Sequence, residues 1–333
     1  MPPTDSSVLP KYWTDVERSE SHRVQLDLIE GGSRVLEIGA AAGHMTRALS
    51  GKGCEVTAVE QDATLAESAR RFCQRLVVTD VESEGFEKHL EGERFDVILL
   101  GDVLEHLKEP DAFLKRLRRH LSPRGCLVAC VPNVAHGAVR LALLQGHFDY
   151  RPAGLLDRTH LRFFTRTSLS SMLDDAGYVI SDLQEIRCGF FVTEIPLDLA
   201  QIPVGTLRLL CRDPEATAYQ FVLRAYPQDS AVPALARNLA CTPQASWDGR
   251  QLTLELLQQY ERLGREALFE HPRDVYRARQ LFYCAFGLEP SFWRLSRLCA
   301  SFLPARIVHH LGRVHDWLRR RGDRGRHVAG QGR

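Results

Sequence analysis

The chain has 333 residues, of which 44% are hydrophobic and 26% charged, and its formal net charge is +1. This composition excludes a chain disordered throughout, and the length fits one large domain with a smaller companion. The balanced charge gives no reason to expect nucleic acid as a partner, because duplex-binding proteins usually carry a marked basic excess.

Residues 1–32 are expected to form an N-terminal helical segment. The opening MPPTDSSVLPKYWTD lacks a charged n-region followed by an apolar stretch, and no run of eighteen uninterrupted apolar residues occurs. The nine cysteines include no C-x-x-C pair and are odd in number, which favours reduced thiols over a disulfide framework or a zinc site. These features predict a cytoplasmic protein without a membrane span.

Between residues 33 and 226, short β-branched runs alternate with helical segments, which is the pattern of a parallel sheet covered on both faces. The predicted strands are 33–39, 54–60, 75–80, 95–102, 125–133, 178–187 and 218–226. The predicted helices are 45–50, 63–74, 111–120 and 168–176. The sequence therefore predicts an α/β fold with a doubly wound, seven-stranded, mostly parallel sheet.

Two stretches interrupt this alternation. Residues 134–164 carry scattered glycines, histidines and aromatics, and we expect them to form a lid over the carboxyl edge of the sheet. Residues 197–211 have the pattern of a helical insertion before the last strand. The domain is thus expected to span 33–226 and to include both interruptions.

The pattern changes after the last predicted strand. Residues 227–250 are polar and proline-rich, which is typical of a linker. Residues 251–320 repeat apolar residues at helical spacing and predict an all-helical appendage, followed by a basic tail at 321–333. This basic helical end could lie on an anionic membrane surface, or it could be a docked helix with a frayed arginine tail.

The first predicted strand runs into a glycine-containing loop, VLEIGAAAGHMTRAL. Nucleotide cofactors bind at such a turn, outside the carboxyl ends of the strands. Gly39 and Gly43 permit a sharp turn, and Glu37 precedes the first glycine by two residues. The loop resembles motif I of class I S-adenosylmethionine (SAM)-dependent methyltransferases, an acidic residue followed by G-x-G-x-G, with Ala41 at the middle glycine. As a dinucleotide fingerprint, G-x-G-x-x-G, it matches only at Gly39.

Acidic residues end the next two predicted strands. Glu60 is placed to accept hydrogen bonds from both ribose hydroxyls of a nucleoside, although a solvated turn residue is the alternative. The resemblance implies that Asp80 meets the adenine amine with Val81 beside the ring, and that S-adenosyl-L-methionine is the cofactor. The expected cofactor contacts are Glu37, Gly39, Ala41, Gly43, Glu60, Gln61, Asp80, Val81, Asp102 and Val103.

The fourth predicted strand runs into D-V-L-E-H at 102–106. This phrase, with SPRGCLVACVPN and HLRFFTRTSLSSMLDDAGYVI downstream, resembles methyltransferases of the ubiquinone-biosynthesis type. The pattern over 33–226 is also similar to bacterial methyltransferases found near polysaccharide or natural-product assembly enzymes. The resemblance implies a small-molecule, sugar or lipid-linked glycan acceptor, methylated on oxygen or nitrogen, with oxygen favoured.

The expected catalytic residues are His106, His160 and Glu105. An imidazole titrates near neutral pH and could take a proton from an acceptor hydroxyl, although His106 could equally be a solvated residue entering a helix. With Asp102, these three side chains could instead hold a divalent cation. A similar arrangement is found in metal-dependent methyltransferases that act on RNA ends, where a glutamate stands in place of Asp102.

The segment DRTHLRFFT offers candidates for an acceptor pocket. Arg158 and Arg162 could bind a phosphate or carboxylate, with Phe163 beside them, whereas Phe164 is expected in the core. Two other functions stay open: a binding module that has lost turnover, suggested by Ala41, and a nicotinamide-dependent oxidoreductase, which the glycine pattern disfavours.

Overall fold

The computed structural model describes residues 19–230, 257–258, 260–262, 264–266, 281–282 and 285. The expected tail at 321–333, most of the segments 227–250 and 251–320, and the start of the N-terminal segment therefore lie outside the described residues. Of the described residues, 19–196 and 215–230 belong to one compact unit, and 197–214 and those from 257 onward to a second. The insertion at 197–214 thus falls with the second unit, whereas the sequence placed it inside the 33–226 domain.

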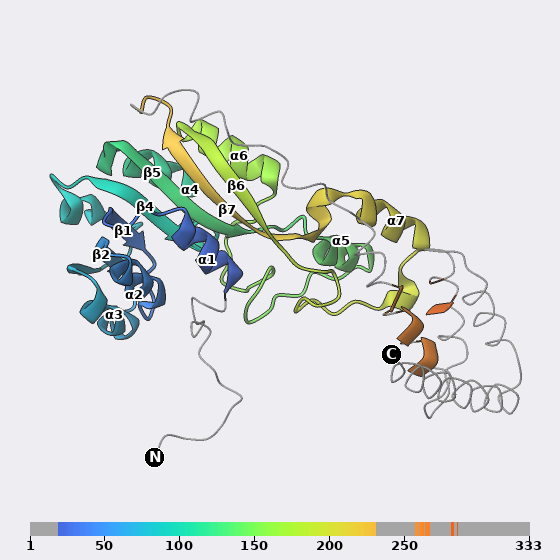
Figure 1. Cartoon of the computed structure of the whole chain (residues 1–333). Coiled ribbons are helices and arrows are strands. Elements are labelled where there is room, and N and C mark those ends of the chain that lie inside the picture. The colour runs from blue at the N-terminus through green and yellow to red at the C-terminus, as the bar shows by residue number, and fades with distance from the viewer. Residues whose placement is uncertain are drawn as a thin grey trace, which may run out of the picture. The chain divides into compact units, whose positions relative to one another are not determined.

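A seven-stranded sheet of order β3-β2-β1-β4-β5-β7-β6 forms the first unit (Figure 1). Its strands are β1 Arg34–Ile38, β2 Glu55–Glu60, β3 Arg75–Val78, β4 Phe95–Gly101, β5 Leu121–Pro132, β6 Tyr178–Arg187 and β7 Ala218–Pro227. The first five pair in parallel, and β7 lies antiparallel between β5 and β6. The doubly wound, mostly parallel sheet predicted from the sequence is confirmed.

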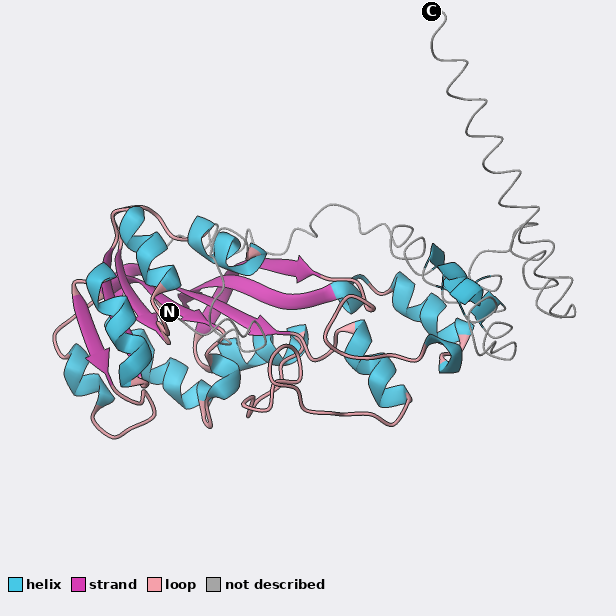
Figure 2. Ribbon diagram, turned by 90° about the horizontal axis from the view of Figure 1, so that it is seen from below, coloured by secondary structure: helices cyan, strands magenta, loops and turns pink. Residues whose placement is uncertain are grey.

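The helices of the first unit are α1 Glu20–Asp27, α2 His44–Gly51, α3 Ala63–Ala69, α4 Pro110–Leu117, α5 Gly137–Leu144 and α6 Arg166–Asp175, and the second unit contains α7 Val204–Arg212. Helices α1, α2 and α3 pack on one face of the sheet, and α4 and α6 pack on the other (Figure 2). Short 3-10 turns are η1 Arg70–Phe72, η2 Phe86–Leu90, η3 Leu104–His106, η4 Arg118–His120, η5 Leu199–Gln201 and η6 Pro214–Thr217. Among the described residues, no helix is long and apolar enough to cross a membrane.

Alternate residues of the strands enter two separate cores. On β4, Ile98 and Leu100 pack with α4 and α6, whereas Val97 and Leu99 pack with α1, α2 and α3. This alternation follows from the period of two along a strand. Because both sets are apolar, β4 must be covered on both faces, as parallel sheets are.

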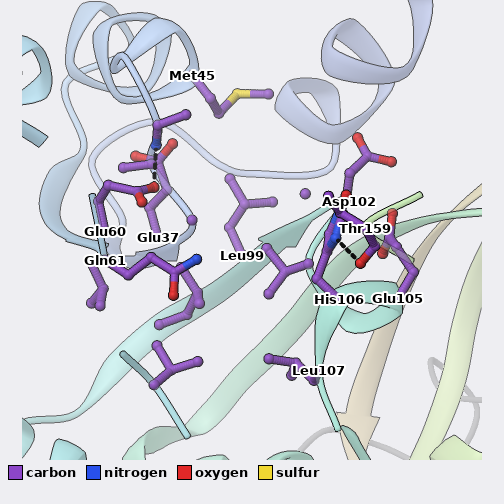
Figure 3. Close-up of a pocket in the computed structure, with 18 of the residues that line it drawn as sticks. Glu37, Met45, Glu60, Gln61, Leu99, Asp102, Glu105, His106, Leu107 and Thr159 are labelled. Carbon is purple, nitrogen blue, oxygen red and sulfur yellow. Dashed lines mark hydrogen bonds between the residues drawn. The ribbon is translucent and has the colours of Figure 1, made fainter. Parts of the chain in front are cut away.

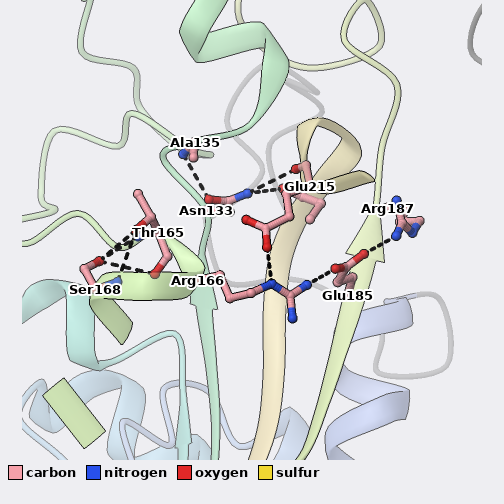
Figure 4. A network of polar contacts seen from close by, with 9 residues as sticks. Asn133, Ala135, Thr165, Arg166, Ser168, Glu185, Arg187 and Glu215 are labelled. Carbon is pink, nitrogen blue, oxygen red and sulfur yellow. Dashed lines mark hydrogen bonds and ion pairs between the residues drawn. The ribbon is translucent and has the colours of Figure 1, made fainter. Parts of the chain in front are cut away.

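A network of ion pairs and hydrogen bonds lies near the carboxyl end of β5 (Figure 4). Arg166 at the start of α6 pairs with Glu185 of β6 and with Glu215, and Arg187 pairs with the same Glu185. The side chain of Asn133 donates to the carbonyl of Ala218 at 2.8 Å and accepts from a backbone amide of the following turn. The network thus joins α6 and the end of β5 to the antiparallel strands β6 and β7, which come later in the chain.

The segment 134–164 is more regular than expected, since it contains α5. Asn133 and Phe164 form an isolated parallel bridge, so the segment leaves the sheet and returns to it at one point. Phe164 is 5% exposed and packs in the core, as predicted. The predicted helix over 63–74 is shorter, because α3 ends at Ala69 and a 3-10 turn follows.

Gly43 offers a test of how tightly α2 packs on α3. Its φ is +81°, and a Cβ there would lie 2.6 Å from the Cα of Ala69, whereas Gly92 has φ +76° with nothing within 4 Å. We expect Gly92→Ala to lower the free energy of unfolding by about 1–2 kcal/mol, through the left-handed backbone alone. Gly43→Ala should cost about 1–3 kcal/mol more, through overpacking. Urea unfolding measures both, and equal losses would contradict the close packing.

Candidate active site

A cavity of about 910 Å³ lies along the carboxyl ends of β1, β2 and β4, within the first unit. Figure 3 shows Glu37, Glu60 and Gln61 on one side of it and Glu105 and His106 on the other. Residues 153–154, 157 and 159–161 of the 134–164 segment also line it. All ten expected cofactor contacts except Gly43 line this cavity, and so do the three expected catalytic residues.

The turn after β1 is held in a left-handed conformation. Gly39, Ala41 and Gly43 have φ of 74°, 46° and 81°. A Cβ on Gly39 would lie 2.8 Å from Cγ2 of Val103, so the loop passes close to the end of β4. Ala41 is one of two described non-glycine residues with positive φ, a conformation that costs about 1–2 kcal/mol for an L-residue. The backbone there has the shape that glycine favours, although the residue is alanine.

Glu60 braces this turn. Its Oε2 accepts a hydrogen bond from the amide of Ala41 at 2.9 Å, and its Oε1 accepts from the amide of Asp62 at 2.9 Å. The side chain is 8% exposed. Because each carboxylate oxygen has two lone pairs, both can still accept a ribose hydroxyl. The expected ribose contact stays a prediction, but the hold on the glycine loop is a role that the sequence did not reveal.

Asp80 and Gln61 are exposed beside the same end of the cavity. Asp80 follows β3, and its Oδ1 accepts from the amide of Glu82 at 2.8 Å. Val81 is half-buried against the core. The three side chains are therefore positioned at the tips of β2 and β3, where an adenosine is expected.

Asp102 directly follows β4 and is hydrogen-bonded to side chains of β5 and β7. Its Oδ1 accepts from Nε2 of Gln220 at 2.7 Å and from Sγ of Cys130 at 3.5 Å. Burial raises the pKa of Asp102 to about 6, and its φ is 55°. This residue is the second described non-glycine with a left-handed backbone. Its strained turn redirects the chain from β4 into η3.

Glu105, His106 and His160 converge at the opposite end of the cavity. One possible ligand atom from each lies within 4.8 Å of the others, and the imidazole centroids are 4.9 Å apart. Nδ1 of His106 lies 3.0 Å from the carbonyl oxygen of Thr159. Since a carbonyl only accepts, Nδ1 carries the proton and the lone pair of the neutral ring is on Nε2.

Glu105 connects this end to the 134–164 segment. Its carbonyl oxygen accepts from the amides of Leu161 and Arg162 at 2.8 and 3.0 Å. The side chain is 1% exposed, and within the described chain its Oε2 has no hydrogen-bond partner. Burial, with Asp102 nearby, raises the pKa of Glu105 well above its usual range. A buried carboxyl between two histidines can share a proton or bind a cation.

The structure divides the four predicted cation ligands. Glu105, His106 and His160 lie together, but Asp102 is outside this group and is bound to Gln220 and Cys130. Oδ1 of Asp102 accepts from Gln220 because β7, inserted next to β5, presents this side chain to it. The structure thus brings three of the four predicted ligands together, and the cation site stays a prediction.

The predicted acceptor residues lie elsewhere. Arg158, Arg162 and Phe163 do not line the described cavity, and both arginines are exposed. Arg162 binds the carbonyl of Lys108 and lies 3.7 Å from a carboxylate oxygen of Glu109. Both arginines are surface groups outside the described cavity, so the expected acceptor contacts at Arg158 and Arg162 stay a prediction.

Glu37 generates a prediction about pH. Burial raises its pKa from 4.5 to about 7, so between these pH values the folded protein holds a proton that the unfolded chain has released. The free energy of unfolding should therefore fall as pH rises through this window, by up to about 3 kcal/mol. We expect Glu37→Gln to remove this contribution to the slope of the free energy of unfolding against pH, measured by urea unfolding from pH 4 to 8. Glu67→Gln, at an exposed position on α3, should leave the slope unchanged; identical profiles for Glu37→Gln and wild type would contradict the assignment.

The chain is similar to known methyltransferases. Ubiquinone biosynthesis O-methyltransferase of Bradyrhizobium diazoefficiens is 30% identical over 155 residues, 46% of this chain and 60% of that protein. The mitochondrial enzyme of that name from Schizosaccharomyces pombe is 26% identical over 159 residues, 46% of this chain and 58% of that protein. The match thus spans about three fifths of these relatives. An S-adenosylmethionine-dependent methyltransferase of Mesorhizobium loti aligns with a TM-score of 0.44 at 16% identity, over 63% of this chain and 99% of that one.

A family model described as a methyltransferase domain matches residues 12–183, which is more than half of the chain. The matched span contains the turn after β1, Glu60, Asp80 and the cluster at 105–106. The chain therefore belongs to the methyltransferase domain family.

Proposed function

We propose that this chain transfers the methyl group of SAM to an oxygen of a small-molecule, sugar or lipid-linked glycan acceptor, with nitrogen as the alternative atom. The observation that carries the proposal is that His106 and Glu105 share one cavity with Glu37 and Glu60. The names of the relatives, O-methyltransferases of ubiquinone biosynthesis, support oxygen. An adenosine at the Glu60 end would leave the His106 end for the acceptor.

The residues at that end suit proton removal. SAM supplies an electrophilic methyl group when bound, so the protein has to orient the acceptor and take its proton. The carbonyl of Thr159 holds the His106 ring with the lone pair on Nε2. The ring of His160 packs against this ring in a T-shaped arrangement, with the centroids 4.9 Å apart. His106 is therefore the proposed base, and His160 and Glu105 lie next to it.

Replacing the proposed base tests this assignment. His106→Asn should lower kcat by about 100- to 10,000-fold, because base catalysis is lost, while affinity for S-adenosylhomocysteine stays within about twofold. The assay follows labelled methyl transfer from SAM into fractionated acceptor pools, then into the acceptor so found. His147→Asn, at an exposed histidine after α5, is the matched control and should keep full activity. No labelled product from any pool would favour a binding module without turnover.

A divalent cation is a second candidate for the same end, supported by the partnerless Oε2 of Glu105 beside two histidines. Glu105, His106 and His160 would hold it, and the cation would polarise the acceptor hydroxyl and lower its pKa.

A chelator separates the two candidates. If His106 acts as a base alone, methyl transfer should be unchanged by excess EDTA, because no other group is needed to accept the proton. Loss of turnover that Mg²⁺ or Mn²⁺ restores would replace the base mechanism with cation assistance. Glu105→Gln should then raise the concentration of Mg²⁺ or Mn²⁺ that turnover requires, because an amide binds the cation less tightly than a carboxylate does.

The remaining expectations concern segments beyond this cavity. The basic end at 321–333 and its proposed contact with an anionic membrane lie outside the described residues. A cytoplasmic location, no nucleic-acid partner and peripheral membrane contact stay predictions of the sequence. Sedimentation of the full chain with anionic liposomes, compared with a chain ending near Leu303, tests the membrane contact.

A further inference from the structure

Residues 151–160 form a loop that closes on itself beside the cavity. The amide of Arg151 donates to the carbonyl of Leu156 at 2.8 Å, and the amide of Arg158 donates to the carbonyl of Arg151 at 2.9 Å. Leu155 and Leu156 are each 1% exposed, so the loop has a small apolar core of its own. Backbone bonds and buried side chains together make it one compact piece of chain.

The end of this loop fixes the ring of the proposed base. Nδ1 of His106 donates to the carbonyl of Thr159 at 3.0 Å, which leaves the lone pair on Nε2. Asp157 is 2% exposed, and its Oδ1 accepts from the amide of Thr159 at 2.8 Å and from the hydroxyl at 2.7 Å. An unrestrained imidazole exchanges between its two tautomers. The tautomer of His106 therefore depends on where the loop holds Thr159.

A carboxylate from outside the loop holds its middle. Oε1 of Glu194 accepts from the amide of Leu155 at 2.6 Å, and Oε2 accepts from the hydroxyl of Tyr219, on β7, at 2.9 Å. Gly154 has φ +93°, and a Cβ there would overlap the carboxyl group of Glu194. This carboxyl group thus lies directly against the loop and joins it to β7.

Buried aromatic groups fix both sides of this tether. The ring of His136 packs against Tyr219 with centroids 5.7 Å apart, and against Phe190 with centroids 5.9 Å apart. His136 and Phe190 are both 0% exposed, and Nε2 of His136 lies 2.9 Å from the carbonyl oxygen of Cys188. Phe190 precedes Glu194 by four residues. A tether mounted on locked side chains can fix the position of a loop.

Glu194 itself is exposed. When its carboxyl group is removed, water can replace it at the amide of Leu155 and at the hydroxyl of Tyr219. Surface substitutions of this kind have small effects on stability. Loss of the tether should therefore release the loop and leave the rest of the fold in place.

We propose that Glu194 is a positioning residue for methyl transfer, because it holds the 151–160 loop against β7. The held loop keeps Thr159 in place, and Thr159 keeps His106 in the tautomer whose lone pair is on Nε2. The inference rests on the proposed function in taking His106 as the base. Glu194 does not line the described cavity, so it acts through the loop and not on a ligand.

Two substitutions at this position test the tether. Glu194→Ala removes both hydrogen bonds, whereas Glu194→Gln keeps an oxygen for the amide of Leu155 and an NH₂ group that can donate to the oxygen of Tyr219. In labelled methyl transfer by the full chain, Glu194→Ala should lower kcat by about tenfold to a hundredfold, because the base is misplaced. Glu194→Gln should stay within about threefold of wild type. Affinity for S-adenosylhomocysteine, measured by titration calorimetry, should stay within about twofold in both variants, since the cofactor end is held separately by Glu60.

The tautomer of His106 is a readout that a merely structural role would not change. Imidazole nitrogen NMR of the full chain at alkaline pH, where the rings are neutral, reports which nitrogen carries the proton, and the His106→Asn spectrum identifies the signals. Wild type and Glu194→Gln should show Nδ1 protonated, whereas Glu194→Ala should show a mixture of tautomers.

Two further variants bracket the result. Tyr219→Phe keeps the ring and removes the hydroxyl, so it should change kcat and the tautomer in the same direction as Glu194→Ala, by a smaller factor. Glu91→Ala, at an exposed carboxylate after η2, is the matched control and should have the turnover and the tautomer of wild type.

Each outcome decides the inference. Loss of kcat with a mixed tautomer in Glu194→Ala, and recovery of both in Glu194→Gln, supports it. Wild-type turnover or a single tautomer in Glu194→Ala overturns it. An equal loss in Glu194→Gln also overturns it, because the charge and not the tether would then matter. If wild type methylates no acceptor pool, the proposed function fails, while the NMR comparison still decides whether Glu194 positions His106.

Discussion

The structure depends on the way one carboxylate holds a left-handed turn. Glu60 at the end of β2 accepts from the amides of Ala41 and Asp62, so it fixes the loop after β1 and the start of the loop after β2 together. Gly39 can then pass close to Val103, and Gly43 can let α2 approach Ala69. The cavity lies next to this turn, along the carboxyl ends of the central strands.

The two ends of this cavity differ in their chemistry. At one end, a buried Glu60 and an exposed Asp80 lie at the tips of adjacent strands, and both line the cavity. At the other, Glu105 is buried beside two histidines, and its carbonyl anchors the returning 134–164 segment. Movement of that segment would therefore also move His160.

Much of the fold was predictable because strand and helix periods are local. The alternation of Val97, Ile98, Leu99 and Leu100 between two cores is visible in the sequence as an unbroken apolar run, which indicates a strand covered on both faces. The antiparallel insertion of β7 between β5 and β6 is less visible, because pairing partners far apart in the chain leave no local signal. That insertion brings Gln220 to Asp102, a contact that the sequence did not indicate.

The sequence by itself determined the sheet, the loop after its first strand, the acidic residues at the strand tips and the histidine that follows β4. These are local patterns, set by periodicity and by the residues that a tight turn accepts. Only the tertiary structure decided that Glu60 braces the loop, that Asp102 faces Gln220, and that Glu194 joins the 151–160 loop to β7. Each of these depends on long-range packing, in which residues far apart in the chain lose water together, and no local pattern records which partners they then find.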